Sequence, residues 1–167
     1  MENCREVDTP MNSNEKLCLQ DNSEKTDPQR YRKLVGALLY FTHSRPDIMF
    51  AVSMVARFMH SPSVHHLGAV KRILSYVKGT IGFGIHYKKG ENFKLLGYSD
   101  NDWGGSQDDR KSTSGWVFSL GSGVIAWCSK KQSITALSST EAEYISLTAA
   151  TCEVVWLRRL LEDLNEK

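Results

Sequence analysis

The chain has 167 residues, of which 41% are hydrophobic and 24% are charged, and its net charge at pH 7 is +2. This length allows one ordinary domain or two small ones, and the composition is typical of a globular protein in aqueous solution. A net charge so close to zero excludes a strong global attraction to nucleic acid, so any such contact needs a local basic face.

The first 26 residues are rich in Asn, Ser, Glu and Lys, and we expect residues 1–26 to form a flexible polar arm. They contain no apolar segment of the kind that a signal peptide requires, and no apolar run in the sequence is long enough to span a bilayer. The four cysteines form no C-x-x-C pair, which favours reduced thiols. These features predict a cytoplasmic or nuclear protein that makes no contact with a membrane.

Residues 27–80 have the spacing of a three-helix unit. Asp27 is a candidate N-cap and Pro28 suits the first helical position of the segment DPQRYRKLVGALLYF. The segments RPDIMFAVSMVARFM and SVHHLGAVKRILSYVKGT each carry an apolar stripe at helical spacing. The sequence therefore predicts three consecutive helices.

From Gly82 the apolar period changes from helical spacing to alternation. The segment GFGIHYKKGENFKLLGYSD predicts two strands around a turn at residues 89–92, and STSGWVFSLGSGVIAWCSKKQ predicts two more around residues 121–123. A long helix follows, from Thr140 to about Leu164. We therefore assign residues 82–167 to a sheet with one helix, and the whole chain to the α+β class.

Two acidic clusters lie in this second part. Asp100 and Asp102 end a predicted strand and share one of its faces, because strand side chains alternate. Glu143 heads an apolar line on the last helix, whereas Glu141 lies about 200° away from it; the line continues through Leu147, Ala150, Val154, Leu157, Leu161 and Leu164. A carboxylate at the head of a core-facing line calls for a partner or a metal ion.

Each cluster also has an ordinary interpretation. The aspartates suit a turn before Trp-Gly-Gly, and a glutamate in a first helical turn is favoured by the helix dipole. Taken together, the clusters are compatible with carboxylates that converge on Mg²⁺, which prefers oxygen ligands. Two such ions about 4 Å apart would hold a phosphodiester during attack by water.

Three segments resemble, in order, the polyprotein of Ty1/copia-type LTR retrotransposons: YRKLVGALLYFTHSRPDIMFAVSMVARFM, HLGAVKRILSYVKGT and LLGYSDNDWGGSQDDRKSTSGWVFSLGSGVIAWCSKKQSITALSSTEAEYISLTAA. The resemblance implies that residues 27–80 are the thumb-like end and connection of a reverse transcriptase. It implies that residues 82–167 are a truncated ribonuclease H-like domain. Asp100 and Glu143 would then be catalytic carboxylates and metal ligands, with Asp102 as a further metal ligand, Mg²⁺ as cofactor and an RNA–DNA hybrid as substrate.

In that family a strand and a helix with further acids follow, whereas this sequence ends at Lys167. We therefore expect no hydrolysis by the fragment alone. One alternative is that a partner chain completes the site in trans at the open sheet edge. Another is a redeployed interaction protein, because similar fragments occur among secreted RxLR-type effectors of oomycetes that act on host immunity. Such a protein would be secreted and delivered to the host cell, although no R-x-L-R string is present.

Overall fold

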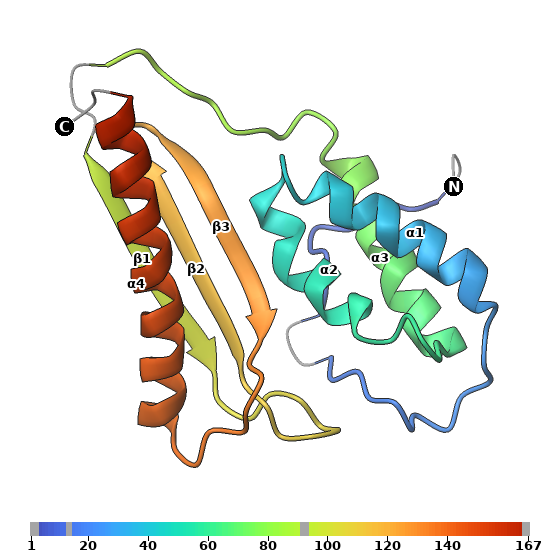
Figure 1. Cartoon of the computed structure of the whole chain (residues 1–167). Helices are drawn as coiled ribbons and strands as arrows, with labels where there is room; N and C mark the ends of the chain where they lie inside the picture. The colour runs from blue at the N-terminus through green and yellow to red at the C-terminus, as the bar shows by residue number, and fades with distance from the viewer. Residues whose placement is uncertain (1–3, 13–14, 91–93, 165–167) are drawn as a thin grey trace. The chain divides into compact units, whose positions relative to one another are not determined.

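The computed structural model describes residues 4–12, 15–90 and 94–164, and the chain divides into two compact units, Met1–Ile85 and His86–Lys167. The first unit contains α1 (Pro28–Phe41), the short 3-10 helix η1 (Pro46–Ile48), α2 (Met49–Ala56) and α3 (Val64–Gly79). The second contains β1 (Leu95–Asp102), β2 (Thr113–Leu120), β3 (Gly123–Lys131) and α4 (Ser139–Asp163) (Figure 1). The α+β class predicted from the sequence is confirmed.

Helix α1 begins where the sequence predicts. The Asp27 side chain accepts a hydrogen bond of 2.8 Å from the backbone N–H of Gln29, and Pro28 occupies the first turn. The three helices enclose a hydrophobic core whose most deeply buried members include Tyr31, Val35, Ile48, Val52, Val55 and Val70. The hydroxyl of Tyr31 donates a hydrogen bond of 2.8 Å to the carbonyl of Val55, so this buried polar group has a hydrogen-bond partner within the core.

Instead of the flexible arm that the sequence predicts over residues 1–26, the described residues 4–12 and 15–26 lie along the helices, and we call them the N-terminal strap. Leu17 is only 3% exposed, and Val7 and Met11 pack against the helical core. The backbone N–H of Val64 also donates to the carbonyl of Glu24 at 2.8 Å. A few apolar side chains in a polar segment are therefore enough to attach it.

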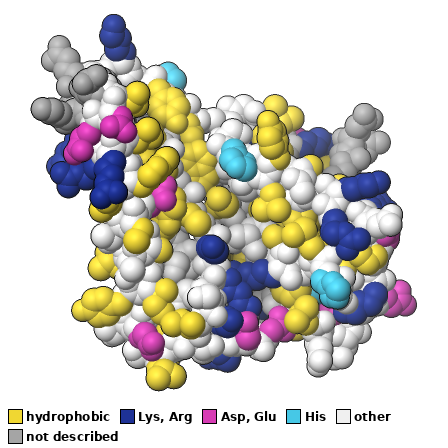
Figure 2. All heavy atoms as spheres, in the orientation of Figure 1, with side chains coloured by type: hydrophobic (Ala, Val, Ile, Leu, Met, Phe, Trp, Pro, Cys, Tyr) yellow, Lys and Arg dark blue, Asp and Glu magenta, His cyan; other side chains and the backbone are white. Residues whose placement is uncertain are grey.

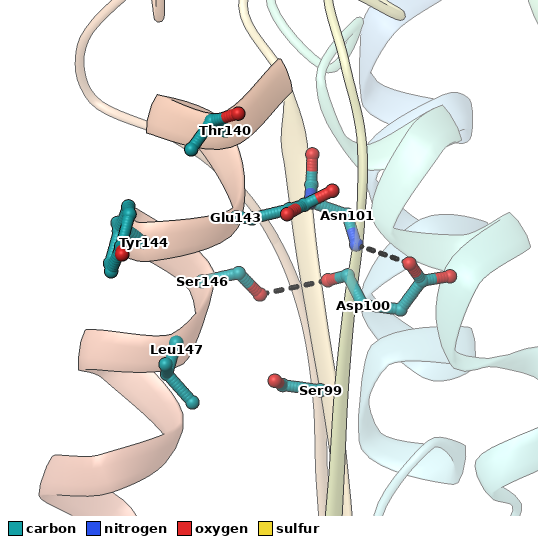
Figure 3. Close-up of a pocket in the computed structure, with 8 residues that line it drawn as sticks. All are labelled: Ser99, Asp100, Asn101, Thr140, Glu143, Tyr144, Ser146 and Leu147. Carbon is teal, nitrogen blue, oxygen red and sulfur yellow. Dashed lines mark hydrogen bonds between the residues drawn. The ribbon is translucent and has the colours of Figure 1, made fainter. Parts of the chain in front are cut away.

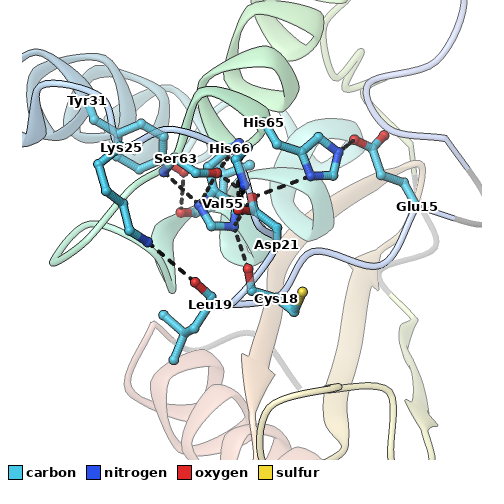
Figure 4. Close-up of polar contacts among 11 residues, drawn as sticks. Glu15, Cys18, Leu19, Asp21, Lys25, Tyr31, Val55, Ser63, His65 and His66 are labelled. Carbon is cyan, nitrogen blue, oxygen red and sulfur yellow. Dashed lines mark hydrogen bonds and ion pairs between the residues drawn. The ribbon is translucent and has the colours of Figure 1, made fainter.

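A buried histidine joins the strap to the start of α3 (Figure 4). Ser63 is the N-cap of α3, and it forms a reciprocal capping box with His66. The imidazole of His66 is fully buried and stacks on Phe58 with ring centroids 3.9 Å apart. Its Nε2 atom lies 3.0 Å from the carbonyl oxygen of Cys18, and the Ser63 hydroxyl donates to a carboxylate oxygen of Asp21.

The second unit is built on an antiparallel sheet in the order β1-β2-β3. The predicted turn between β2 and β3 is present, and Gly121 takes a φ of +57° in it. The strand predicted from Gly82 does not form, because the backbone of residues 82–90 pairs with none of these strands. The turn predicted over residues 89–92 lies partly outside the described residues.

Hydrogen bonds that involve side chains, rather than backbone pairing between strands, attach Tyr87 and Lys88 to the sheet. The hydroxyl of Tyr87 donates to the carbonyl of Val124 at 2.6 Å, and the backbone N–H of Lys88 donates to the hydroxyl of Ser122 at 2.8 Å. The Tyr87 ring occupies the space that a side chain on Gly123 would fill, since a Cβ there would lie 2.4 Å from the ring.

Helix α4 packs on one face of the sheet, where Ala150 and Leu157 contact Phe118. The line of buried residues on α4 runs through Ala142, Ser146, Ala150 and Leu157. The prediction that Glu143 heads the buried line is therefore wrong: Glu143, Leu147 and Leu164 are exposed. Small residues face the sheet because they allow helix and strand to approach closely. Hydrophobic side chains also reach the surface along α4 (Figure 2). None of the described helices is both long and apolar enough to cross a membrane.

Candidate carboxylate site

A cavity of about 470 Å³ lies between β1 and the first turns of α4 (Figure 3). Asp100 from the strand and Glu143 from the helix both line it, so the fold brings the two predicted catalytic residues to one place. The full lining comprises Ser99, Asp100, Asn101, Thr140, Glu143, Tyr144, Ser146 and Leu147. The lining residues therefore include two acidic residues, an asparagine and several residues with hydroxyl groups.

The start of α4 explains why Glu143 rather than Glu141 reaches the cavity. Ser138 is the N-cap, and its side chain accepts a hydrogen bond of 3.1 Å from the backbone N–H of Glu141. The Glu141 carboxylate in turn accepts from the backbone N–H of Leu137 at 2.6 Å. Glu141 thus serves the helix end, whereas Glu143 is exposed and points toward Asn101 in Figure 3.

Asp100 is attached to its surroundings by both backbone and side chain. Its carbonyl oxygen accepts a hydrogen bond of 2.8 Å from the Ser146 hydroxyl, which fixes α4 against β1. Its carboxylate accepts from the backbone N–H of Asn101 at 2.8 Å and points away from α4 (Figure 3). Asp100 and Glu143 therefore line one cavity, but their carboxylates do not face each other.

The side chain of Asp102 contacts both ends of the loop between β1 and β2. Its Oδ1 atom accepts a hydrogen bond from the backbone N–H of Thr113, the first residue of β2. Its Oδ2 atom fills the space beside Gly105, where a Cβ would lie 1.9 Å away. Asp102 shares the strand with Asp100, as predicted, but does not line the cavity.

An ion pair fastens the same loop to β3. Asp109 and Lys131 form an ion pair of 2.7 Å. Burial alone would raise the pKa of Asp109, but hydrogen bonds from Lys131, Ser106 and the backbone of Lys111 outweigh it and lower that pKa to about 2. The loop therefore carries a carboxylate that is ionised at neutral pH and paired with a lysine.

The residues that line the cavity have the right chemical groups for a divalent cation, but too few of them are carboxylates. Carboxylate, amide and hydroxyl oxygens are the ligands that Mg²⁺ prefers. Among residues 4–12, 15–90 and 94–164, however, no three His, Cys, Asp or Glu side chains are grouped closely enough to hold a metal ion. Ser146 is not among the residues predicted from the sequence, although the small residues at positions 142, 146 and 150 indicate a close contact between helix and strand.

No protein-family model matches the chain, and no solved structure matches it. The chain is 46% identical, over 95% of its length, to the retrovirus-related Pol polyprotein from transposon RE1 of Arabidopsis thaliana. It is 40% identical, over 99% of its length, to that from transposon TNT 1-94 of Nicotiana tabacum. The chain spans only 11% and 13% of these two relatives. It is also 44% identical, over 76% of its length, to secreted RxLR effector protein 161 of Plasmopara viticola, of which it covers 90%.

Proposed function

The chain belongs to the Pol polyproteins of copia-type retrotransposons, and from this premise we propose that its second unit is part of a ribonuclease H-like domain acting on RNA–DNA hybrids. The first unit would be the end of the reverse transcriptase that precedes it. One observation carries the proposal: Asp100 and Glu143, which lie far apart in the sequence, line the same cavity between β1 and α4.

Asp100 and Glu143 would hold a divalent cation in this cavity, with Asn101 beside them. Such a cation, when bound, stabilises negative charge on a phosphodiester and promotes attack by water. The exposed Glu143 carboxylate is available to it directly. Asp100 would have to give up its hydrogen bond from Asn101 N–H and turn toward α4. Metal binding is therefore expected to reorient the Asp100 side chain.

Two carboxylates alone bind Mg²⁺ weakly, because the number of charged ligands and their rigidity set the affinity. We therefore propose that this chain contributes half of a metal site and has little or no hydrolytic activity by itself. Strand β1 lies at the edge of the sheet among the described strands. A further strand from elsewhere in a polyprotein, or from a partner chain, would pair there and supply more acids.

The proposal is tested by calorimetric titration of the chain with Mn²⁺ and Mg²⁺. Asp100→Asn and Glu143→Gln should each abolish the weak binding, whereas Glu141→Gln, which alters the neighbouring capping carboxylate, should leave it intact. The absence of binding to the unaltered chain, or equal binding by all the variants, would refute the metal site. Cleavage of a labelled hybrid that is lost in the Asp100→Asn/Glu143→Gln double variant would show that the chain rebuilds a complete site.

The chain covers 90% of the P. viticola effector protein, and this coverage favours a second candidate function, that of an interaction protein that acts on host immunity. In that case the effect on host immunity would not require the carboxylates of Asp100 and Glu143. Expression in plant cells should suppress a defence response, and the double variant should suppress it equally. Suppression that disappears in the double variant, or no suppression at all, would count against this candidate.

A further inference from the structure

An exposed tryptophan is held at the end of the unit where the cavity lies. Trp103 directly follows β1, and its side chain is 58% exposed. Its indole Nε1–H donates to the carbonyl of Ala136 at 3.4 Å, just before α4 begins. This long hydrogen bond connects one edge of the indole to the segment that precedes α4, while much of the ring is open to solvent.

An arginine lies beside Gly104, the residue that follows this tryptophan. Arg110 has a φ of +57°, a left-handed conformation that residues other than glycine rarely adopt, and its N–H donates to the carbonyl of Ser106 at 3.0 Å. Its Nη2 atom lies 3.4 Å from the position that a Cβ on Gly104 would occupy. The guanidinium is therefore folded back against the residue next to Trp103.

The charge of Arg110 is not neutralised within the described part of the chain. Lys131 is paired with Asp109 at 2.7 Å, and the ammonium of Lys111 donates to the carbonyl of Ser133 at 2.7 Å. Arg110 is exposed and forms no ion pair with any described residue. A backbone conformation that is seldom adopted thus presents a cation that is free to meet an external anion.

We propose that Trp103 and Arg110 form a contact for one strand of nucleic acid, in which the indole packs on a base or sugar and the guanidinium meets a phosphate. An exposed aromatic ring next to an unpaired cation is the combination by which proteins bind nucleic-acid strands. This inference rests on the proposed function for the kind of ligand. It adds positioning residues outside the cavity, at the same end of the unit as Asp100 and Glu143.

The test measures binding of a fluorescent RNA–DNA hybrid by anisotropy, in EDTA so that no metal contributes, at several salt concentrations. Trp103→Ala should weaken binding about tenfold, and Trp103→Phe should retain most of the affinity. Arg110→Ala should reduce the slope of log affinity against log salt by about one. Trp156→Ala is the matched control: Trp156 is 55% exposed but lies thirteen residues beyond Glu143 on α4, or about 20 Å along the helix.

Undiminished binding by Trp103→Ala, an equal loss in Trp156→Ala, or no binding of the hybrid to the unaltered chain would each overturn the inference. So would equally tight, Trp103-dependent binding of an acidic peptide, which would identify a protein partner instead. The metal site is judged separately, because calorimetry with Mn²⁺ and Mg²⁺ alone reports metal binding, whereas anisotropy in EDTA reports binding of the hybrid without metal.

Discussion

The backbone N–H of Ser63 donates a hydrogen bond of 3.0 Å to Nδ1 of His66. Because Nδ1 accepts this bond, the ring proton of a neutral imidazole lies on Nε2, which donates to the carbonyl of Cys18 at 3.0 Å. A second ring proton would face the Ser63 N–H directly. The capping box of α3 therefore depends on a neutral His66, whereas the Nε2–H bond to the N-terminal strap can form in either protonation state.

The stability of the first unit should accordingly fall with acid in the range where an unfolded histidine titrates. Burial lowers the pKa of His66, and His65 and Lys25 add to this effect, while Asp21 and the Cys18 carbonyl oppose it. The unfolded chain thus binds a proton more readily than the folded chain, and stability is lost as the pH falls below about 6.5.

Urea unfolding followed by circular dichroism between pH 5 and pH 8 should show this loss in the unaltered chain and a flatter profile in His66→Gln. His43→Gln, which removes an exposed histidine outside the capping box, is the matched control variant. Asp21 should not contribute in this range, because the hydrogen bond from Ser63 holds its pKa far below the usual value. A profile for His66→Gln that matches the unaltered chain would refute the prediction.

Two leucines of the strap should differ sharply in their effect on stability. Leu17 is 3% exposed, and Leu17→Ala should lower the free energy of unfolding of the first unit by about 2–5 kcal/mol. Leu19 is 45% exposed, and Leu19→Ala should change it little. Hydrogen exchange of the strap amides measures the effect directly, and similar protection in both variants would show that the strap is not attached through Leu17.

The sheet should be sensitive to a methyl group at Gly97. The Phe118 ring lies across Gly97, and a Cβ there would lie 2.2 Å from the ring. Gly97→Ala should therefore lower the free energy of unfolding of the second unit by about 1–3 kcal/mol. Gly115→Ala is the control, since its Cβ would lie 3.7 Å from its nearest neighbour. All four tryptophans lie in this unit, so their fluorescence reports its unfolding, and equal midpoints for the two variants would contradict the prediction.

Substitutions of the two glutamates at the start of α4 should differ in their effect on stability, because Glu141 caps the helix and Glu143 lines the cavity. Glu141→Gln weakens the capping bond to Leu137 N–H and should lower the free energy of unfolding of the second unit by about 0.5–1 kcal/mol. Glu143→Gln alters an exposed carboxylate and should leave it within about 0.5 kcal/mol of the unaltered chain. Chemical denaturation compares the two, and a larger loss in Glu143→Gln would mean that Glu143 supports the fold.

The sequence predicts elements whose signals are local. Asp27 and Pro28 define the start of α1 because capping depends on neighbouring residues alone. The alternation around Gly121 likewise predicts the β2–β3 hairpin correctly. The strap escapes prediction because its polar composition hides the few apolar side chains, such as Leu17, that attach it.

The remaining differences arise from tertiary contacts. Residues 82–90 have the alternation of a strand, but a strand needs a partner, and here Tyr87 makes the contact instead. In α4 the periodicity places Glu143 close to the buried line, yet only the packing of Ala142 and Ser146 on the sheet decides which side of the helix is covered. The orientation of the Asp100 carboxylate likewise depends on its bond with Asn101 N–H, which composition and spacing do not reveal.

The meander order of the sheet has a consequence for how quickly the second unit can form. Each strand pairs with its neighbour along the chain, and only residues 121 and 122 separate β2 from β3. Such a hairpin closes in about 1–10 μs, whereas a ribosome adds about 5–20 residues per second. These strands can therefore pair with one another as soon as they leave the ribosome.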